Sequence, residues 1–268
     1  MVIRTLLQES GIDRLDAEVL LAHVLKIPRE KLLFSFNMPV PIVLQASFSA
    51  LCEKRKKGCP VAYLIGEKEF YGLPFYVNES TLIPRPDTEL LVEWAIEKAE
   101  GKRVLDVCTG TGCIGISVAK NAHISALTLA DISAEALSVA QKNADRLCVR
   151  AAFFQLDILK DSLPGQFDLI LSNPPYIESD VIPTLERDVQ NYEPHLALDG
   201  GADGLDFYPV IIKKAYAALS PSGWLGLEIG FAQGEAVSGM MHPFFEEVRI
   251  LYDLAGHMRA VVGRKKSV

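Results

Sequence analysis

Several features that would assign this 268-residue chain to other protein classes are missing from its sequence. No apolar run reaches the ~20 residues that a bilayer-spanning helix needs, and residues 1–20 have the pattern of an amphipathic helix and not of a signal peptide. The five cysteines are odd in number and scattered, and no Cys-x-x-Cys pair occurs, so neither a zinc site nor a disulfide framework is indicated. These features predict a cytoplasmic protein that carries no metal and does not bind membranes.

Basic residues are also in short supply. The chain has 27 Lys and Arg against 34 Asp and Glu, a formal net charge of −7, which argues against a protein that mainly binds the phosphate backbone of nucleic acid. The charge is uneven, because residues 1–60 hold 9 basic and 6 acidic side chains while the remainder holds 18 and 28. We interpret the basic run 54–57 (KRKK) as a solvated helix end, where the helix dipole favours cations. No stable binding of nucleic acid is expected.

The pattern of apolar residues and turn signals divides the chain into three parts. Residues 1–60 repeat apolar side chains at helical spacing, which predicts a small helical bundle. Residues 61–86 are rich in aromatic side chains, with Gly72 and Pro74 as turn signals, which predicts a β-hairpin linker. From residue 87 to 268 strands and helices alternate, which predicts an α/β domain with a mostly parallel sheet covered on both faces.

The expected elements of the α/β domain follow from the same pattern. Strands are expected at 103–107, 125–130, 150–156, 167–171 and 222–229, with two further candidates near 246–252 and 259–264. Helices are expected at 88–99, 112–121, 133–145 and 205–219, and residues 173–204 are expected to be irregular.

A glycine-rich turn, residues 106–112 (DVCTGTG), connects the expected strand 103–107 to the next helix. Glycines let the backbone approach a ligand closely, and a helix N-terminus offers free N–H groups. Asp131 ends the next strand, 19 residues after Gly112, where a carboxylate can accept from both ribose hydroxyls. The spacing predicts nucleotide binding, although a glycine turn that merely connects strand to helix is the alternative, and it does not separate a dinucleotide from S-adenosylmethionine (AdoMet).

Two details favour AdoMet over a dinucleotide. The turn lacks the pattern Gly-x-Gly-x-x-Gly, and Asp106 lies on the strand, where it can meet the cationic amino-acid end of AdoMet but would repel a pyrophosphate. Asp157, after the third strand, is a further candidate near the adenine, although it could equally cap a turn.

The stretch 172–177 (SNPPYI) directly follows the expected strand 167–171. Ligands of open α/β sheets bind at the carboxyl ends of the strands, so Asn173 should lie on the same edge as the glycine turn. Pro174 and Pro175 fix their own φ and lack N–H donors, so the loop is stiff and presents two acceptors, the Asn173 side-chain oxygen and the Pro174 carbonyl. Such a pair can hold a planar NH2 group while Tyr176 packs on its flat face. For the proline pair alone, a strand-terminating turn is the alternative.

This loop predicts methylation of an amide or aromatic amine. The lone pair of such a nitrogen is delocalised, and as a methyl group transfers, positive charge develops on it that two oxygen dipoles stabilise. No general base is required before transfer. His195 follows Glu193-Pro194, but no Ser or Cys nucleophile pattern accompanies it, and we interpret it as an ordinary loop histidine.

Together these motifs resemble those of the release factor glutamine methyltransferases (the HemK/PrmC family) over nearly the whole chain. The residues that carry the resemblance are 66–72 (GEKEFYG), 82–89 (LIPRPDTE), 106–112, 172–177, 193–194 (EP) and 200–204 (GGADG). The resemblance implies a Rossmann-like class I AdoMet-dependent methyltransferase fold. It implies methyl transfer from AdoMet to the side-chain amide of the glutamine in the Gly-Gly-Gln motif of class I peptide chain release factors, which modulates translation termination. The helical N-terminal domain would help to dock that protein partner.

The resemblance also assigns roles to individual residues. The catalytic residues would be Asn173, Pro174 and Tyr176. The substrate-binding residues would be these three with Pro175, Arg85 and Glu193, and the residues that hold AdoMet would be Asp106, Thr109, Gly110, Thr111, Gly112, Asp131, Asp157 and Asn173. Cys108 departs from the family, which usually has glycine there; if that position needs a positive φ, cysteine is strained and the affinity for AdoMet is affected.

Three other functions compete with this interpretation. An adenine-amino methyltransferase would also offer an acceptor pair to a planar NH2, but it needs a basic groove and room for a flipped base, whereas residues 61–268 are acidic. The intact acceptor pair counts against a non-catalytic AdoMet- or nucleotide-binding protein. The absence of Gly-x-Gly-x-x-Gly counts against an NAD-dependent oxidoreductase.

Overall fold

Contacts divide the chain into two units in the computed structural model, which describes residues 1–266. The helical unit comprises Met1–Glu67 and Glu186–Tyr192, and the sheet unit comprises Lys68–Leu185 and the chain from Glu193 onward. This division differs from the predicted one, because most of the predicted linker belongs to the sheet unit and a segment of the expected irregular region belongs to the helical unit. No helix within residues 1–266 is long and apolar enough to cross a membrane.

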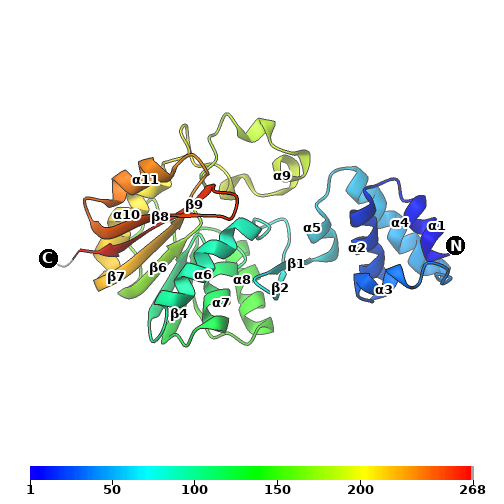
Figure 1. The fold of residues 1–268 in the computed structure, drawn as a ribbon, viewed down its shortest axis with the longest axis horizontal. Helices are drawn as coiled ribbons and strands as arrows, with labels where there is room; N and C mark the ends of the chain where they lie inside the picture. The colour runs from blue at the N-terminus through cyan, green and yellow to red at the C-terminus, as the bar shows by residue number, and fades with distance from the viewer. Residues whose placement is uncertain (267–268) are drawn as a thin grey trace. The chain divides into compact units, whose positions relative to one another are not determined.

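The helical unit consists of α1 (Ile3–Gln8), α2 (Arg14–Leu25), α3 (Arg29–Leu33), α4 (Ile42–Lys56), α5 (Val61–Ile65) and α9 (Arg187–Tyr192) (Figure 1). The Asp13 side chain begins α2 by accepting a hydrogen bond from the backbone N–H of Leu15 at 2.8 Å. Apolar side chains of α1, α2, α3 and α4 form a separate core, which includes Ile3, Leu20, Leu21, Leu32 and Phe48.

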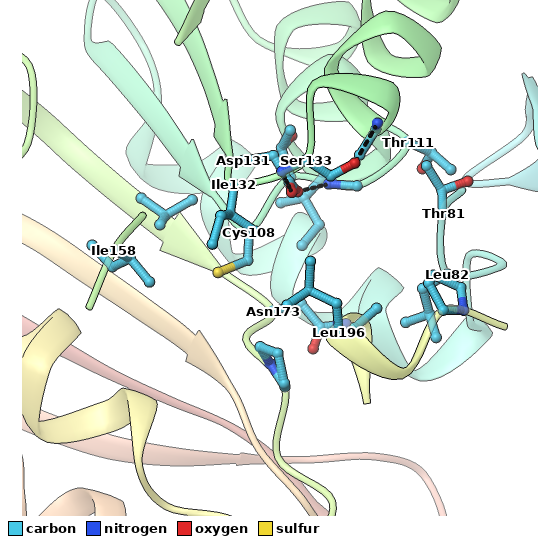
Figure 2. A pocket seen from close by; sticks show the side chains of 18 of the residues that line it. Thr81, Leu82, Cys108, Thr111, Asp131, Ile132, Ser133, Ile158, Asn173 and Leu196 are labelled. Atoms are coloured by element: carbon cyan, nitrogen blue, oxygen red, sulfur yellow. Dashed lines mark hydrogen bonds between the residues drawn. The ribbon is translucent and has the colours of Figure 1, made fainter. Parts of the chain in front are cut away.

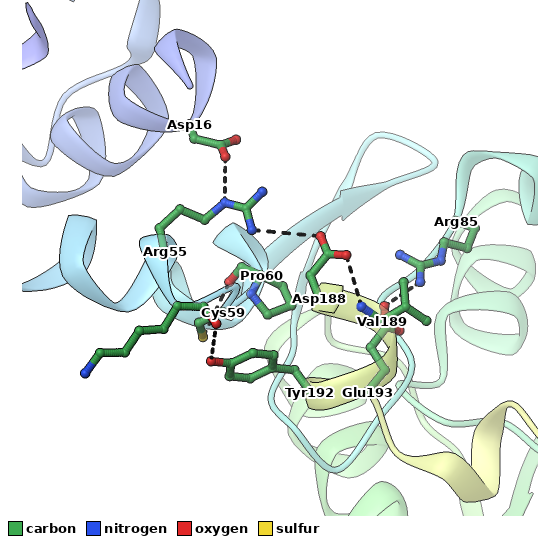
Figure 3. A network of polar contacts seen from close by, with 10 residues as sticks. Asp16, Arg55, Cys59, Pro60, Arg85, Asp188, Val189, Tyr192 and Glu193 are labelled. Carbon is green, nitrogen blue, oxygen red and sulfur yellow. Dashed lines mark hydrogen bonds and ion pairs between the residues drawn. The ribbon is translucent and has the colours of Figure 1, made fainter. Parts of the chain in front are cut away.

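Polar contacts join α9 to the other helices of this unit (Figure 3). Arg55 Nε donates to Asp16 Oδ2 at 2.6 Å, and Arg55 Nη1 lies 3.9 Å from Asp188 Oδ2. The Tyr192 hydroxyl donates to the Lys57 carbonyl at 3.2 Å. The basic run 54–57 is therefore only partly the solvated helix end that we predicted, because Arg55 is half-buried among carboxylates.

The sheet unit is built on a seven-stranded sheet with the order β5-β4-β3-β6-β7-β9-β8. Its strands are β3 (Arg103–Val107), β4 (Ala126–Asp131), β5 (Ala152–Gln155), β6 (Phe167–Ser172), β7 (Leu219–Glu228), β8 (Phe245–Tyr252) and β9 (Met258–Lys265). Neighbouring strands from β5 to β7 are parallel, whereas β9 pairs antiparallel with both β7 and β8. The chain order reverses at β3, so the carboxyl ends of β3 and β6 lie at the point where such sheets bind ligands.

Helices cover both faces of this sheet (Figure 1). On one face, α6 (Glu89–Lys98), α7 (Cys113–Asn121) and α8 (Ala134–Arg146) pack on Val104, Leu169 and Leu171. On the other, α10 (Phe207–Ala218) and α11 (Gly234–Met241) pack on Leu105 and Ile170. Successive residues of a strand point to opposite faces, so each central strand contributes to both cores, as the apolar runs predicted.

The predicted α/β domain is confirmed, and strand 103–107 has the predicted bounds. The two terminal strand candidates are also confirmed and pair with one another as an antiparallel hairpin. The expected irregular region contains α9 and the 3₁₀ turns Ile182–Thr184 and His195–Ala197. In the predicted linker only β1 (Glu67–Phe70) and β2 (Leu73–Tyr76) form a two-stranded sheet, and Val61–Ile65 is helical.

Besides the packing of Phe70 and Phe75 in the core of the sheet unit, one buried polar side chain, Asn143 of α8, holds the hairpin β1–β2. Asn143 Oδ1 accepts from the Tyr76 N–H at 2.7 Å, and Nδ2 donates to the carbonyls of Tyr76 and Thr111 at 3.0 Å each. The Asn143 side chain is fully buried. It thus joins the hairpin to the glycine-rich turn through three hydrogen bonds that water cannot replace.

Replacement of Asn143 by alanine is expected to lower the free energy of unfolding by about 2–4 kcal/mol, because it leaves buried backbone groups without partners. Urea-induced unfolding measures this change. Gln141→Ala is the control, since Gln141 is exposed on the same helix, and it should change the free energy of unfolding by less than about 0.5 kcal/mol. An Asn143→Ala protein as stable as the control would contradict this account.

Candidate functional site

One cavity of about 210 Å³ lies where the carboxyl ends of β3, β4, β5 and β6 meet. Figure 2 shows Cys108, Asp131, Ile158 and Asn173, which follow or end these four strands, around the same space. Two further segments close the cavity, residues 80–88 at the end of the predicted linker and just after it, and residues 194–197 from the loop before α10. The predicted site residues that line it are Arg85, Thr109, Gly110, Thr111, Asp131, Asp157, Asn173 and Pro175. Among the described residues, the other five predicted ones lie outside the lining, namely Asp106, Gly112, Pro174, Tyr176 and Glu193.

The glycine-rich turn has the tight form that its sequence suggests. Gly112 has φ 80°, and a Cβ built on it would lie 2.8 Å from Ile116 Cδ1, so only glycine fits at the start of α7. The Gly110 N–H donates to Asp131 Oδ2 at 2.9 Å. The turn is therefore fixed from inside by packing and from the cavity side by the carboxylate that ends β4.

Asp106 supports this turn from behind. Its carboxylate is completely buried, and Oδ2 accepts from Thr109 Oγ1 at 2.7 Å and from the Gly115 N–H at 3.0 Å. Burial raises the pKa of Asp106 to about 7, although both hydrogen bonds oppose that shift. Oδ1 has no hydrogen-bond partner among residues 1–266. The predicted direct contact with a ligand stays a prediction, and what the structure shows is a brace for the turn.

Asp131 lines the cavity at the end of β4. Besides the bond from Gly110, its Oδ1 accepts from the Ser133 N–H at 3.0 Å. Burial raises the pKa of this carboxyl, and the backbone N–H groups act in the opposite direction. Each carboxylate oxygen has a further lone pair for the hydroxyl groups of a ligand.

Asp157 also lines the cavity, and it caps a turn as the alternative interpretation suggested. Its Oδ1 accepts from the Leu159 N–H at 3.0 Å, and its Oδ2 lies 2.7 Å from Lys160 Nζ, which holds the pKa of the carboxyl below its usual value. The predicted position of Asp157 near the adenine of a bound ligand stays a prediction.

The Asn-Pro-Pro-Tyr loop leaves β6 at the centre of the same edge. Ser172 Oγ, fully buried, donates to the Val107 carbonyl at 2.7 Å and so ties the start of the loop to β3. The Asn173 side chain lines the cavity, and Pro174 and Pro175 are buried. No donor within residues 1–266 reaches the Asn173 side-chain oxygen or the Pro174 carbonyl. Two consecutive acceptors are thus left without protein partners.

Tyr176 closes the loop on the side of β7. Burial raises the pKa of Tyr176, and the nearby Glu228 carboxylate at the end of β7 adds to the shift. Burial also raises the pKa of Glu228 to about 7. Sequence reasoning did not find Glu228, because nothing separates a single acidic residue at a strand end from a surface one.

Arg85 and Glu193 form an ion pair at the entrance of the cavity (Figure 3). Glu193 is almost completely buried, and its Oε2 also accepts from the Ile83 N–H at 3.1 Å. This carboxylate therefore joins the 82–86 segment to the loop that begins at residue 193, while Arg85 itself faces the cavity.

Cys108 lies in the cavity wall with a left-handed backbone, φ 58°. That conformation costs a residue with a Cβ about 1–2 kcal/mol and costs glycine little. Burial raises the pKa of the Cys108 thiol, with the Asp131 carboxylate adding to the shift, so the group is neutral at physiological pH. The positive φ observed here is the condition under which strain was expected from the sequence.

The chain resembles two protein families and many curated proteins. Residues 2–66 match the family described as PrmC N-terminal domain, and residues 85–200 match the Methyltransferase small domain family. A release factor glutamine methyltransferase from Geobacter sulfurreducens is 40% identical over 240 residues, 88% of this chain and 84% of that protein. One with the same name from Cereibacter sphaeroides is 41% identical over 262 residues, 96% of this chain and 94% of that protein.

Solved structures share the fold at lower identity. A methyltransferase from Pyrococcus furiosus has a TM-score of 0.56 and 17% identity and covers 81% of this chain and 98% of its own. A 16S rRNA N2 G1207 methyltransferase from T. thermophilus, solved with AdoMet and guanosine, has a TM-score of 0.52 and 16% identity and covers 75% of this chain and 50% of its own.

Replacement of Cys108 tests the strain in the glycine-rich turn. We expect Cys108→Gly to unfold at a higher temperature than Cys108→Ala, because alanine keeps the Cβ that opposes a positive φ. Glycine loses more backbone entropy on folding, which offsets part of this advantage, so the free energies of unfolding should differ by about 0.5–1 kcal/mol. Both variants lack the thiol, so their comparison isolates the backbone. A glycine variant less stable than the alanine variant would show that the turn is unstrained.

Proposed function

The chain belongs to the release factor glutamine methyltransferase family, and we propose that Asn173 and the Pro174 carbonyl hold the substrate glutamine during methyl transfer. As a member of this family it is an AdoMet-dependent methyltransferase that transfers a methyl group to a side-chain amide of release factors. The observation that supports the proposed role is a pair of consecutive acceptors, one on Asn173 in the cavity wall and one on Pro174 next to it, neither of which has a protein donor within the described chain.

The residues of the cavity suit AdoMet. We propose that the Asp131 carboxylate accepts from the ribose hydroxyls and that the backbone of Thr109, Gly110 and Thr111 borders the ligand. Asp106, which does not line the cavity, would act indirectly by fixing the turn. Asp157 would lie near the adenine. Bound AdoMet supplies an electrophilic methyl group on a sulfonium sulfur.

The acceptor pair would prepare the amide nitrogen for reaction. Each N–H of the glutamine amide donates to one oxygen, which fixes the plane of the amide and directs the face of its nitrogen toward the methyl donor. Because both oxygens carry partial negative charge, they stabilise the positive charge that develops on nitrogen during transfer. No chain residue has to remove a proton first, since the methylated amide loses its proton readily afterwards.

An adenine-amino methyltransferase is less well supported. The acidic balance of residues 61–268, with 18 basic and 28 acidic side chains, is unfavourable for binding a nucleic acid backbone.

We propose that the substrate glutamine is the one in the Gly-Gly-Gln motif of class I release factors, that the chain acts in the cytoplasm and that methylation modulates translation termination.

The helical unit carries a surface suited to docking the release factor. Four apolar side chains between residues 34 and 43 are exposed, namely Phe34, Met38, Ile42 and Val43, and Phe34 is 90% exposed. Arg4 and Arg14 both stack on Phe36 beside this surface. Exposed apolar patches with charged surroundings mark protein interaction sites, so we propose that this docking surface contacts the release factor outside its methylated glutamine.

Replacement of Asn173 separates binding of the substrate amide from binding of the cofactor. We expect Asn173→Ala to reduce the turnover of a release factor by roughly 10²-fold, the scale seen on losing a preorganised polar contact, and to change the Kd for AdoMet little. Asn173→Asp keeps an acceptor oxygen and should lose less. Mass spectrometry of the release factor and calorimetry with AdoMet measure the two quantities. Equal losses of both would show that Asn173 serves only the cofactor.

Replacement of apolar side chains tests the docking surface. The double variant Phe34→Ser/Ile42→Ser should raise KM for an intact release factor about tenfold, equivalent to 1.4 kcal/mol. Both side chains are largely exposed in the free protein and would lose their apolar contacts with the release factor. Turnover of a short Gly-Gly-Gln peptide should not change. Ala50→Ser, also exposed on α4, is the control. An unchanged KM for the intact factor would exclude this surface.

A further inference from the structure

The side chain of Gln233, at the start of α11, forms a complete set of hydrogen bonds behind the Asn-Pro-Pro-Tyr loop. Its Nε2 donates to the Tyr176 carbonyl at 3.0 Å and to the Gly204 carbonyl at 3.1 Å. Its Oε1 accepts from the Gly230 N–H at 2.9 Å and lies 3.3 Å from the hydroxyl of the buried Tyr208. Two carbonyls on one side and an N–H on the other determine the orientation of this amide.

The contact falls at the end of the loop, directly before the backbone pairing of Ile177. Ser172 fixes the start of the loop through the Val107 carbonyl. At the other end the Tyr176 carbonyl accepts from Gln233, and the next residue, Ile177, pairs with 198–200 by backbone hydrogen bonds. The loop is therefore held by hydrogen bonds at both of its ends.

The backbone of residues 200–204 approaches Tyr176 closely. A Cβ on Gly204 would lie 2.3 Å from the Tyr176 oxygen and 2.7 Å from Gln233 Nε2. A Cβ on Gly200 would lie 2.7 Å from the Tyr176 Cα. Glycines at these positions allow the backbone to approach closely enough for Gln233 to bond both carbonyls.

The Asn-Pro-Pro-Tyr loop is also stiff between its ends. Pro175 fixes its own φ and keeps Pro174 extended, so few backbone rotations separate the Tyr176 carbonyl from the Pro174 carbonyl. A shift of one carbonyl is therefore transmitted to the other. At a reaction site, a misplacement of ~1 Å can cost 10²-fold in rate.

We propose that Gln233 is a positioning residue for methyl transfer: its amide fixes the Tyr176 carbonyl and, through the proline pair, the acceptors of Asn173 and Pro174. This inference rests on the proposed function of that acceptor pair. Gln233 does not line the cavity among the described residues, so it acts on the loop and not on AdoMet or the substrate.

Two substitutions test the proposal with intact release factor and AdoMet. Gln233→Ala removes the anchor. Gln233→Glu keeps an acceptor for the Gly230 N–H but turns a carboxylate oxygen toward the carbonyls of Tyr176 and Gly204. Each should reduce kcat at least about tenfold, while the Kd for AdoMet and the KM for release factor stay within about twofold. Asn121→Ala, which removes an amide hydrogen bond at the far end of α7, is the control and should leave kcat unchanged.

A double-mutant cycle distinguishes positioning from a general loss of stability. Rates are measured well below the unfolding midpoint of each variant. If Gln233 acts through the acceptor pair, then in an Asn173→Ala background either substitution at Gln233 should lower kcat by less than about threefold, whereas independent effects would multiply. The cycle with Gln233→Glu gives the same test if Gln233→Ala does not fold.

The outcomes separate this inference from the function on which it rests. A wild-type kcat in Asn173→Ala would refute the proposed function. A reduced kcat in Asn173→Ala together with a wild-type kcat in both Gln233 variants would overturn only the inference about Gln233. Multiplied losses in the double variants would also overturn it. Strong single losses without further loss in the double variants are the expected result.

Discussion

The Asn173 side-chain oxygen and the Pro174 carbonyl are hydrogen-bond acceptors that the described chain does not satisfy. Asn173 is half-buried in the cavity wall, so solvent can reach its side chain in the free protein, and the surrounding structure serves to hold the two acceptors in place. Here the surrounding structure is the strand β6 before the loop, the proline pair within it and Gln233 after it. A ligand with two N–H donors would satisfy both acceptors, and in our proposal this selects for such a group.

The same type of contact recurs around the cavity. Asn143, Glu193 and Gln233 each use one polar side chain to hold backbone groups that lie 67, 110 and 57 residues away in the sequence. The turn, linker and loop that border the cavity have few backbone hydrogen bonds of their own in strands or helices. Side chains of α8, of the residue that precedes α11 and of the loop at residue 193 therefore supply the anchoring that regular structure supplies elsewhere.

The sequence was sufficient to predict where strands occur along the chain and which residues lie at their ends, because both follow from local patterns. Asp131 and Asn173 line the cavity since they end or follow strands of a parallel sheet. Asp106 was placed on the correct strand, but side chains of a strand alternate between faces. Its carboxylate bonds the Gly115 N–H of α7 and does not face the cavity. Contacts such as those of Asn143 and Gln233 depend on folded geometry, and no local pattern predicts them.

Unfavourable local features are concentrated in the glycine-rich turn, where β3 and α7 hold them in place. Cys108 has a left-handed backbone, and Asp106 is buried with its pKa raised from 3.8 to about 7. Between those two pH values the folded protein keeps a proton on Asp106 that the unfolded chain loses, so this group makes folding less favourable as pH rises through that window. The protein retains a carboxylate there because it bonds both Thr109 and Gly115, and a turn with this shape is what the cavity requires. Local stability is thus exchanged for a preformed ligand site.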